Sequence, residues 1–76
     1  RKIEAILLKY GRRKFKYKDY NFYIIYDHAE LSVDILNNTF LHHLNMIYFD
    51  TKELCQQAVE EAGEENIKKY IFGVKD

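Results

Sequence analysis

The chain has 76 residues, about half the length of a typical domain, so a two-domain enzyme is excluded. Twelve Lys and Arg residues balance twelve Asp and Glu residues, so the whole chain has no electrostatic preference for nucleic acid, an anionic membrane or an acidic substrate. Apolar residues make up 47% and aromatic residues 16%, which is too hydrophobic for a disordered segment. We expect one small domain over 1–76, and the start at Arg1 suggests a fragment of a longer protein.

The single cysteine and the short apolar runs bear on the compartment of the protein. One cysteine forms no internal disulfide, and the chain shows no secretory pattern. No apolar run approaches the ~20 residues that cross a bilayer. We therefore expect a cytoplasmic protein without a membrane partner.

The N-terminal half predicts a helix followed by strands. Apolar residues recur at helical spacing over 1–10, and Gly11 is placed to end that helix in the left-handed conformation. Aromatic and cationic residues then alternate with a period of two over 12–18, which is strand spacing. Residues 21–26 are β-branched and aromatic, and 31–35 alternate cleanly, so these two runs are expected to pair as a hairpin.

Beyond the hairpin, the period changes from strand to helix. Residues 37–39 mark a loop, 40–45 show no clear pattern, and 46–49 form a third run of strand composition. An amphipathic helix follows, and its apolar face carries Leu54, Cys55, Ala58, Val59 and Ala62. Gly63 is the predicted stop of this helix.

The amphipathic helix has a capping signal at its start. Asp50 is predicted to cap the first turn, and Glu53 to reach back to it. Phe49 is expected to pack on Leu54 as a hydrophobic staple. Residues 64–70 predict further helical turns, and the C-terminal side chains expected to face the core are Ile67, Tyr70, Ile71, Phe72 and Val74.

These elements predict an α+β fold. It consists of a short N-terminal helix, a two- to three-stranded antiparallel sheet, an amphipathic helix packed on one face and a short C-terminal helix. Such an arrangement is among the few ways in which so short a chain buries its apolar surface.

Residues for covalent catalysis are few. The hydroxyl and thiol nucleophiles of Ser, Thr and Cys are Ser32, Thr39, Thr51 and Cys55. Cys55 lies on the predicted apolar face, where a thiol acts as a small inert hydrophobe. No spacing provides a general base held by a third group. We therefore predict no enzyme activity and no catalytic residue.

The histidines do not predict a metal site. His42 and His43 are adjacent, and His28 and Cys55 would be needed to complete four ligands. Neighbouring residues on a strand face opposite sides, so the adjacent pair holds one ion only in an irregular segment. The simpler interpretation is a polar loop with solvated or helix-capping imidazoles. We predict no metal and no cofactor.

The positive charges gather in one stretch. Residues 9–18 hold six of the twelve cations, namely Lys9, Arg12, Arg13, Lys14, Lys16 and Lys18. Aromatic residues, with Tyr17 among them, alternate with these cations. The stretch offers cations for phosphates and aromatic planes for bases, so 9–20 is a candidate nucleic-acid surface. An alternative interpretation has equal weight. In it, the stretch is an edge strand whose lysines prevent aggregation while its aromatic residues face the core.

The segment 48–58 reads Tyr-Phe-Asp-Thr-Lys-Glu-Leu-Cys-Gln-Gln-Ala, with an aromatic strand end, a Thr-Lys-Glu helix start and small residues soon after. With the tail over 65–74, it resembles short, poorly characterised phage and mobile-element proteins of low-GC Gram-positive bacteria. It is more weakly similar to the AP2-like arm-type DNA-binding domain of tyrosine integrases. That resemblance implies a three-stranded sheet, followed by one helix, that binds DNA.

Two function classes follow from these observations. The first is a non-enzymatic binding module of phage or mobile-element origin, which binds nucleic acid through 9–20. The alternative is a protein–protein interaction module, either a phage inhibitor of a host protein or a homodimeric assembly domain, because Tyr and Phe suit interfaces as well as cores.

Overall fold

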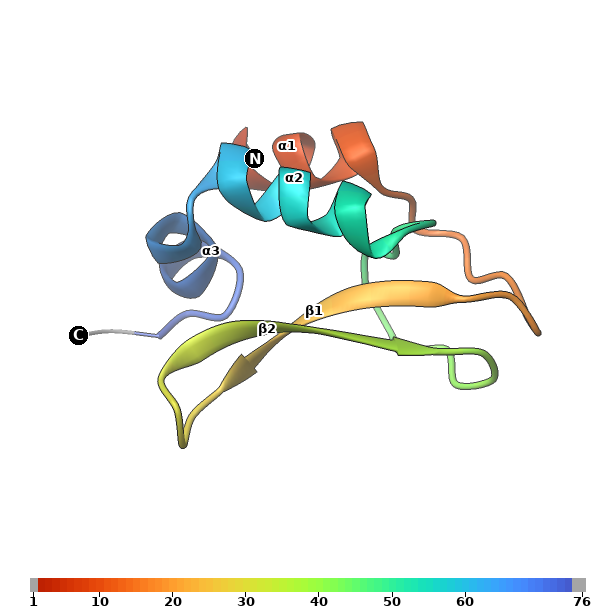
Figure 1. Ribbon diagram of the computed structural model, residues 1–76. Coiled ribbons are helices and arrows are strands. Elements are labelled where there is room, and N and C mark those ends of the chain that lie inside the picture. Colours follow the sequence, from red (N-terminus) through yellow and green to blue (C-terminus); the bar gives the residue numbers. More distant parts are fainter. Residues whose placement is uncertain (1, 75–76) are drawn as a thin grey trace.

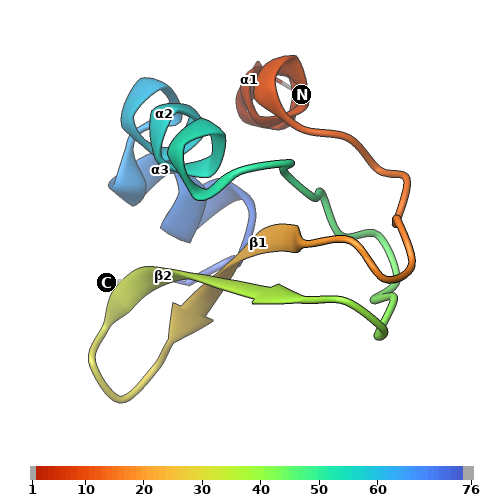
Figure 2. The ribbon, with the colours of Figure 1, turned by 45° about the vertical axis from the view of Figure 1, so that its right-hand side comes forward.

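The computed structural model describes residues 2–74. Its elements in chain order are helix α1 (Lys2–Tyr10), strands β1 (Asn21–Asp27) and β2 (Ser32–Asn38), and helices α2 (Lys52–Ala62) and α3 (Glu64–Tyr70). The strands form an antiparallel hairpin, and α1 and α2 lie side by side over one face of it (Figure 1, Figure 2). The predicted α+β fold is confirmed. Arg1 of the predicted first helix lies outside the described residues.

The predicted third strand is reduced to two bridging residues. Tyr48 exchanges two backbone hydrogen bonds with Arg12, at N···O distances of 2.7 and 2.6 Å. Phe49 exchanges two with Phe22 of β1, at 3.0 and 2.8 Å. Residues 48–49 therefore lie between Arg12 and β1. The pairing does not extend into a regular strand over 46–49.

The predicted strand over 12–18 is wrong beyond Arg12, because this segment wraps around the buried side chain of Asn21. The Asn21 Oδ1 accepts a hydrogen bond from the Lys16 backbone N–H at 3.0 Å, and its Nδ2 donates to the Lys16 carbonyl at 2.9 Å. Lys18 has a φ of +71°, which no regular strand contains. A side chain thus bonds the backbone groups that a strand ladder would otherwise bond.

The second strand is longer than predicted. β2 continues through Asn38, whereas the Asn and Thr residues of 37–39 predict a loop. The Asn38 carbonyl accepts a hydrogen bond from Nδ2 of the buried Asn21 at 3.2 Å, and its own Oδ1 accepts from the backbone N–H groups of Phe40 and Leu41. These contacts hold Asn38 in the strand, and the loop begins after it.

The core lies between the hairpin and the helices. Its fully or nearly buried members are Leu7, Ile24, Phe49, Cys55, Ala58, Ala62 and Ile67. The three members from α2 are small, so this helix approaches α1 and the sheet closely. The predicted apolar face of α2 is confirmed.

The C-terminal helix buries fewer side chains than predicted. Ile67 is fully buried and Phe72 packs against the core, as expected. Tyr70 is exposed, so its predicted inward orientation is wrong. Ile71 is 38% exposed, but its side chain lines an apolar cleft together with Ile24 and Ile67. The helix α3 ends at Tyr70, and so short an element covers the core with little more than one side chain.

Two glycines end helices, but in different ways. Gly63 ends α2 as predicted, with a φ of +89° and its N–H donating to the Val59 carbonyl at 2.8 Å. Gly11 follows α1 and donates to the Leu7 carbonyl at 2.9 Å. It is not among the positive-φ residues of the described chain, so the predicted left-handed conformation of Gly11 is wrong.

The helix α2 begins one residue later than predicted. Thr51 is its N-cap, and the Thr51 Oγ1 accepts a hydrogen bond from the Leu54 backbone N–H at 3.1 Å. The predicted cap, Asp50, instead binds Arg12 and Lys16. A tertiary ion pair therefore decides which of two adjacent acceptors caps the helix.

Replacing Thr51 by Ala removes this acceptor and is expected to lower the free energy of unfolding by about 1 kcal/mol. Thr51→Ser keeps the hydroxyl and should keep most of the stability. Urea denaturation measures the free energy of unfolding of both variants. The comparison is valid if the slope of that free energy against urea concentration is the same in both. Equal losses in the two variants would contradict the assignment of Thr51 as the cap.

Candidate nucleic-acid interface

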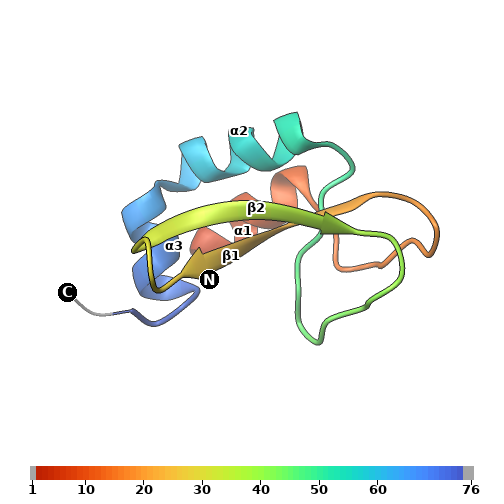
Figure 3. The same ribbon diagram turned by 60° about the horizontal axis from the view of Figure 1, so that its bottom comes forward.

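Two loops meet at the end of the hairpin opposite the 28–31 turn (Figure 3). They are residues 12–20 and 39–46, and we call them the two-loop end. The Lys18 backbone N–H donates to the Thr39 carbonyl at 2.8 Å, which ties the loops together. The candidate residues Arg12 to Lys18 all lie at this end.

A small aromatic cluster anchors both loops to the sheet. Tyr48 is fully buried, and its ring centroid lies 5.3 Å from that of Phe15, 5.9 Å from that of His42 and 6.0 Å from that of Tyr23. The Tyr48 hydroxyl accepts a hydrogen bond from the His43 backbone N–H at 2.7 Å. These contacts gather around the buried Tyr48 ring and link both loops to β1.

Most of the predicted cations are bound to carboxylates of the same chain. The ion pairs are Lys9–Glu61 at 3.2 Å, Arg12–Asp50 at 2.9 Å, Arg13–Glu4 at 2.9 Å and Lys16–Asp50 at 3.3 Å. Three of these four pairs join 9–18 to the acidic residues of 50–65. Charges that are separate in the sequence therefore neutralise each other in the fold.

The Arg12 side chain makes several contacts within the fold. Its side chain is only 17% exposed, and its Nε donates to Asp50 Oδ1 at 2.9 Å. Its Nη1 donates to the Lys14 carbonyl and, at 3.1 Å, to Asn21 Oδ1. Hydrogen bonds from Arg12, and then from Lys16, hold the pKa of Asp50 below its ordinary value. Arg12 thus ties the first loop to the start of α2.

Lys9 stands apart from the other candidates. It lies at the end of α1, where its Nζ and the Tyr10 hydroxyl both donate to the Glu61 carboxylate of α2. Hydrogen bonds from Tyr10 and Lys9 lower the pKa of Glu61. The structure therefore assigns Lys9 to the contact between two helices and not to the two-loop end.

Lys14, Lys18, Tyr17 and Tyr20 remain available to a ligand. Neither lysine pairs with a carboxylate among residues 2–74. Tyr17 is 67% and Tyr20 is 66% exposed, and the Lys18 Nζ lies 5.6 Å from the centre of the Tyr17 ring. Tyr20 was not among the predicted site residues, although it belongs to the same aromatic stretch.

The second loop adds an apolar surface that the sequence analysis missed. Phe40, Leu41 and Leu44 are exposed, and Leu44 reaches 91%. The segment 40–45 has no periodic pattern, so its sequence alone carries no signal for which side chains face solvent. It contains no Asp, Glu, Lys or Arg residue.

The single cysteine is buried, and two of the histidines contact aromatic rings. Cys55 is fully buried, and burial raises the pKa of its thiol to about 12. His42 stacks on Phe15, with ring centroids 5.3 Å apart, and His43 packs against Tyr23. Within 2–74, no group of three or more His, Cys, Asp or Glu residues is placed to hold a metal ion.

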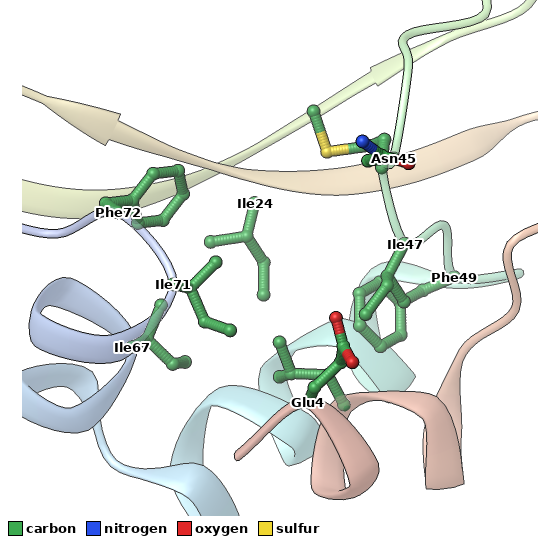
Figure 4. A pocket seen from close by; sticks show the side chains of 10 residues that line it. Glu4, Ile24, Asn45, Ile47, Phe49, Ile67, Ile71 and Phe72 are labelled. Atoms are coloured by element: carbon green, nitrogen blue, oxygen red, sulfur yellow. The ribbon is translucent and has the colours of Figure 1, made fainter. Parts of the chain in front are cut away.

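An apolar cleft of about 220 Å³ opens between α1, α3 and the segment 45–49. Ile24, Ile67 and Phe72 face this cleft, and the Glu4 carboxylate stands at its edge (Figure 4). That carboxylate already pairs with Arg13 at 2.9 Å. Ligand sites are commonly about 300 to 1,000 Å³ with several converging polar groups. The cleft is smaller and offers few such groups, so we assign it no ligand.

Comparisons of the chain with protein-family models, curated proteins and solved structures found no significant match. The resemblance to phage proteins and to the integrase domain therefore stays a prediction. Among the helices of the described chain, none has the length and apolar content needed to cross a membrane.

Proposed function

We propose that the chain is a non-enzymatic nucleic-acid-binding module of phage or mobile-element origin, and that the two-loop end holds a single strand. The observation that supports this most directly is that one loop carries two exposed tyrosine rings, Tyr17 and Tyr20, and two uncompensated lysines, Lys14 and Lys18. Bases stack on exposed aromatic rings while lysines contact the phosphates. No base-specific pocket is required for this mode of binding.

A single strand suits this surface better than a duplex does. Stacking on tyrosine requires bases with a free face, and duplex DNA offers such faces only at its ends. The uncompensated charge is also small, because the ion pairs of Arg12, Arg13 and Lys16 reduce the field that a duplex would meet.

The test is fluorescence anisotropy with a labelled, mixed-sequence single-stranded oligonucleotide at 50 and 200 mM salt. Two phosphate contacts on a single strand imply that the logarithm of affinity falls by about 1.4 per logarithmic unit of salt. The double variant Lys14→Gln/Lys18→Gln should remove most of this dependence. The double variant Tyr17→Ala/Tyr20→Ala should weaken binding at least tenfold and leave the salt dependence unchanged, since each stacked base contributes about 1–3 kcal/mol.

The matched control is the double variant Lys69→Gln/Tyr70→Ala. It removes an exposed lysine and the exposed tyrosine ring beside it, 5.2 Å from Nζ to the ring centre, on α3 rather than on the loop. Its affinity should equal that of the unaltered chain. If no oligonucleotide binds better than ~100 μM at 50 mM salt, the affinity is no better than non-specific attraction and the proposal fails.

A protein–protein interaction module is the second candidate. The observation in its favour is the exposed apolar group on the second loop, Phe40, Leu41 and Leu44. Leu41 and Leu44 do not stack on bases as aromatic rings do, and exposed apolar groups of this kind often mark protein interfaces. This candidate becomes the working function if the oligonucleotide test fails.

A further inference from the structure

The strand β2 has one edge that no other described strand covers. In the sheet, β2 pairs with β1 on one side only (Figure 2). Phe22 directs its backbone N–H and carbonyl to Phe49, away from β2, so its pair with Asn37 is not hydrogen-bonded. In an antiparallel ladder such pairs alternate with bonded ones, so Ile24–Ile35 and Tyr26–Val33 are not hydrogen-bonded either.

The outward-facing backbone groups of β2 therefore belong to Val33, Ile35 and Asn37. An independent contact supports this assignment, because the Val33 N–H donates to the Glu64 carboxylate of α3 at 3.2 Å. No described group bonds the N–H of Ile35 or of Asn37. The edge is thus closed near the hairpin turn and open over 35–37.

The open part of this edge lacks the usual protection against strand pairing. Natural edge strands carry lysine, proline or a bulge that prevents another strand from adding. The segment 35–38 reads Ile-Leu-Asn-Asn and has none of these. Leu36 is also 45% exposed on the face of the sheet that points away from the helices. An apolar, uncharged edge of this kind favours pairing with a strand that is itself uncharged.

We propose that two copies of the chain pair through this edge, β2 against β2, to form a four-stranded antiparallel sheet. The two-fold axis passes beside Leu36, so that Leu36 meets Leu36 of the partner subunit. Ile35 then exchanges two backbone hydrogen bonds with Asn37 of the partner subunit, and Asn37 does the same with the partner's Ile35. Every open N–H of the edge obtains an acceptor.

Charge and sterics disfavour an axis at Asp34. With the axis at Leu36, the carboxylate of Asp34 stands opposite the partner's Asn38. An axis at Asp34 would set two carboxylates against each other, which is unfavourable. It would also place a strand where the Glu64 carboxylate already binds Val33. The occupant that fits best is therefore a second copy, because the uncharged part of the edge is complementary to itself.

The dimer is tested by sedimentation of the pure chain between ~10 μM and ~1 mM, without nucleic acid, so its failure does not depend on the proposed function. We expect a monomer–dimer equilibrium within this range. Leu36→Lys places charges opposite each other at the axis and should give only monomer. Leu31→Lys changes an equally large exposed leucine in the hairpin turn, and should dimerise like the unaltered chain. Circular dichroism confirms that both variants fold.

Cysteine cross-linking tests the register. Residues that face each other in a non-hydrogen-bonded antiparallel pair have Cα atoms about 4.5 Å apart, within disulfide range. Leu36→Cys should therefore form a disulfide-linked dimer on mild oxidation, and Asp34→Cys should not. The native Cys55 is buried and does not compete. The proposal is overturned by a monomer at every concentration, by a Leu36→Lys dimer, or by cross-linking of Asp34→Cys instead of Leu36→Cys.

Discussion

Replacing Asn21 by Ala is expected to lower the free energy of unfolding by about 3 kcal/mol and to release the 12–20 loop. The Asn21 side chain is fully buried. Its amide donates to three backbone carbonyls and accepts from one backbone N–H and one guanidinium, and these partners belong to Lys16, Asp19, Asn38 and Arg12. Alanine removes these bonds. The Arg12 guanidinium keeps Asp50 and the Lys16 carbonyl keeps the Asp19 N–H, but the Lys16 N–H and the Asp19 carbonyl lose their described partner. Each buried group left unpaired costs about 1–3 kcal/mol. Water entering the space recovers part of the loss.

Two variants make this prediction specific. Asn21→Asp keeps the shape and the acceptors but loses the amide donor, and it sets a carboxylate against the Lys16, Asp19 and Asn38 carbonyls, so it should also destabilise the fold. Asn37→Ala, on the exposed edge of β2, should change stability by less than about 0.5 kcal/mol. Urea denaturation gives the free energies, and hydrogen exchange of the Lys16 amide reports the release of the loop. A stable Asn21→Ala variant with a protected Lys16 amide would contradict the prediction.

The parts of the fold that the sequence predicts correctly are those set by local periodicity. The small apolar residues of α2 recur at helical spacing, the run over 21–26 is β-branched and aromatic, and the run over 31–35 alternates as strands do. These patterns depend only on which side chains share a face. The helices, the hairpin and the buried thiol of Cys55 are therefore confirmed.

The errors arise where a distant residue competes with a local pattern. Residues 12–18 alternate like a strand, but Asn21 bonds their backbone and turns them into a loop. Asp50 is as good a helix cap as Thr51, but Arg12 binds Asp50 from the other end of the chain. Neither competition is visible in a window of neighbouring residues.

The candidate site shows the same limit. The cationic stretch is evident in the sequence, yet which cations stay uncompensated depends on Glu4, Asp50 and Glu61, which only the fold brings close. The open edge of β2 is a second example. Its sequence is unremarkable, and its exposure follows from the pairing of Phe49 with Phe22 on the other side of the sheet.

Gly11 is the point of closest approach between α1 and the segment 47–49. A Cβ on Gly11 would stand 2.7 Å from the Tyr48 carbonyl oxygen, 2.8 Å from the Phe49 ring and 2.9 Å from Cγ2 of Ile47. Tyr48 and Phe49 are both fully buried and bonded to the sheet, so neither moves freely. The absence of a side chain, rather than a left-handed backbone, is what this position requires.

Gly11→Ala is therefore expected to lower the free energy of unfolding by about 1–3 kcal/mol. The loss should lie near the upper end of this range, because one of the clashing atoms is a backbone oxygen that cannot move freely. The added methyl pushes the Tyr48 backbone away from Arg12, so the amides of these two residues should exchange with solvent faster. The control is Gly73→Ala, where a Cβ meets no atom within 4 Å and only the φ of +67° opposes it. Its loss should be smaller, about 1 kcal/mol. A Gly11→Ala variant as stable as the unaltered chain would show that α1 does not approach residues 47–49 this closely.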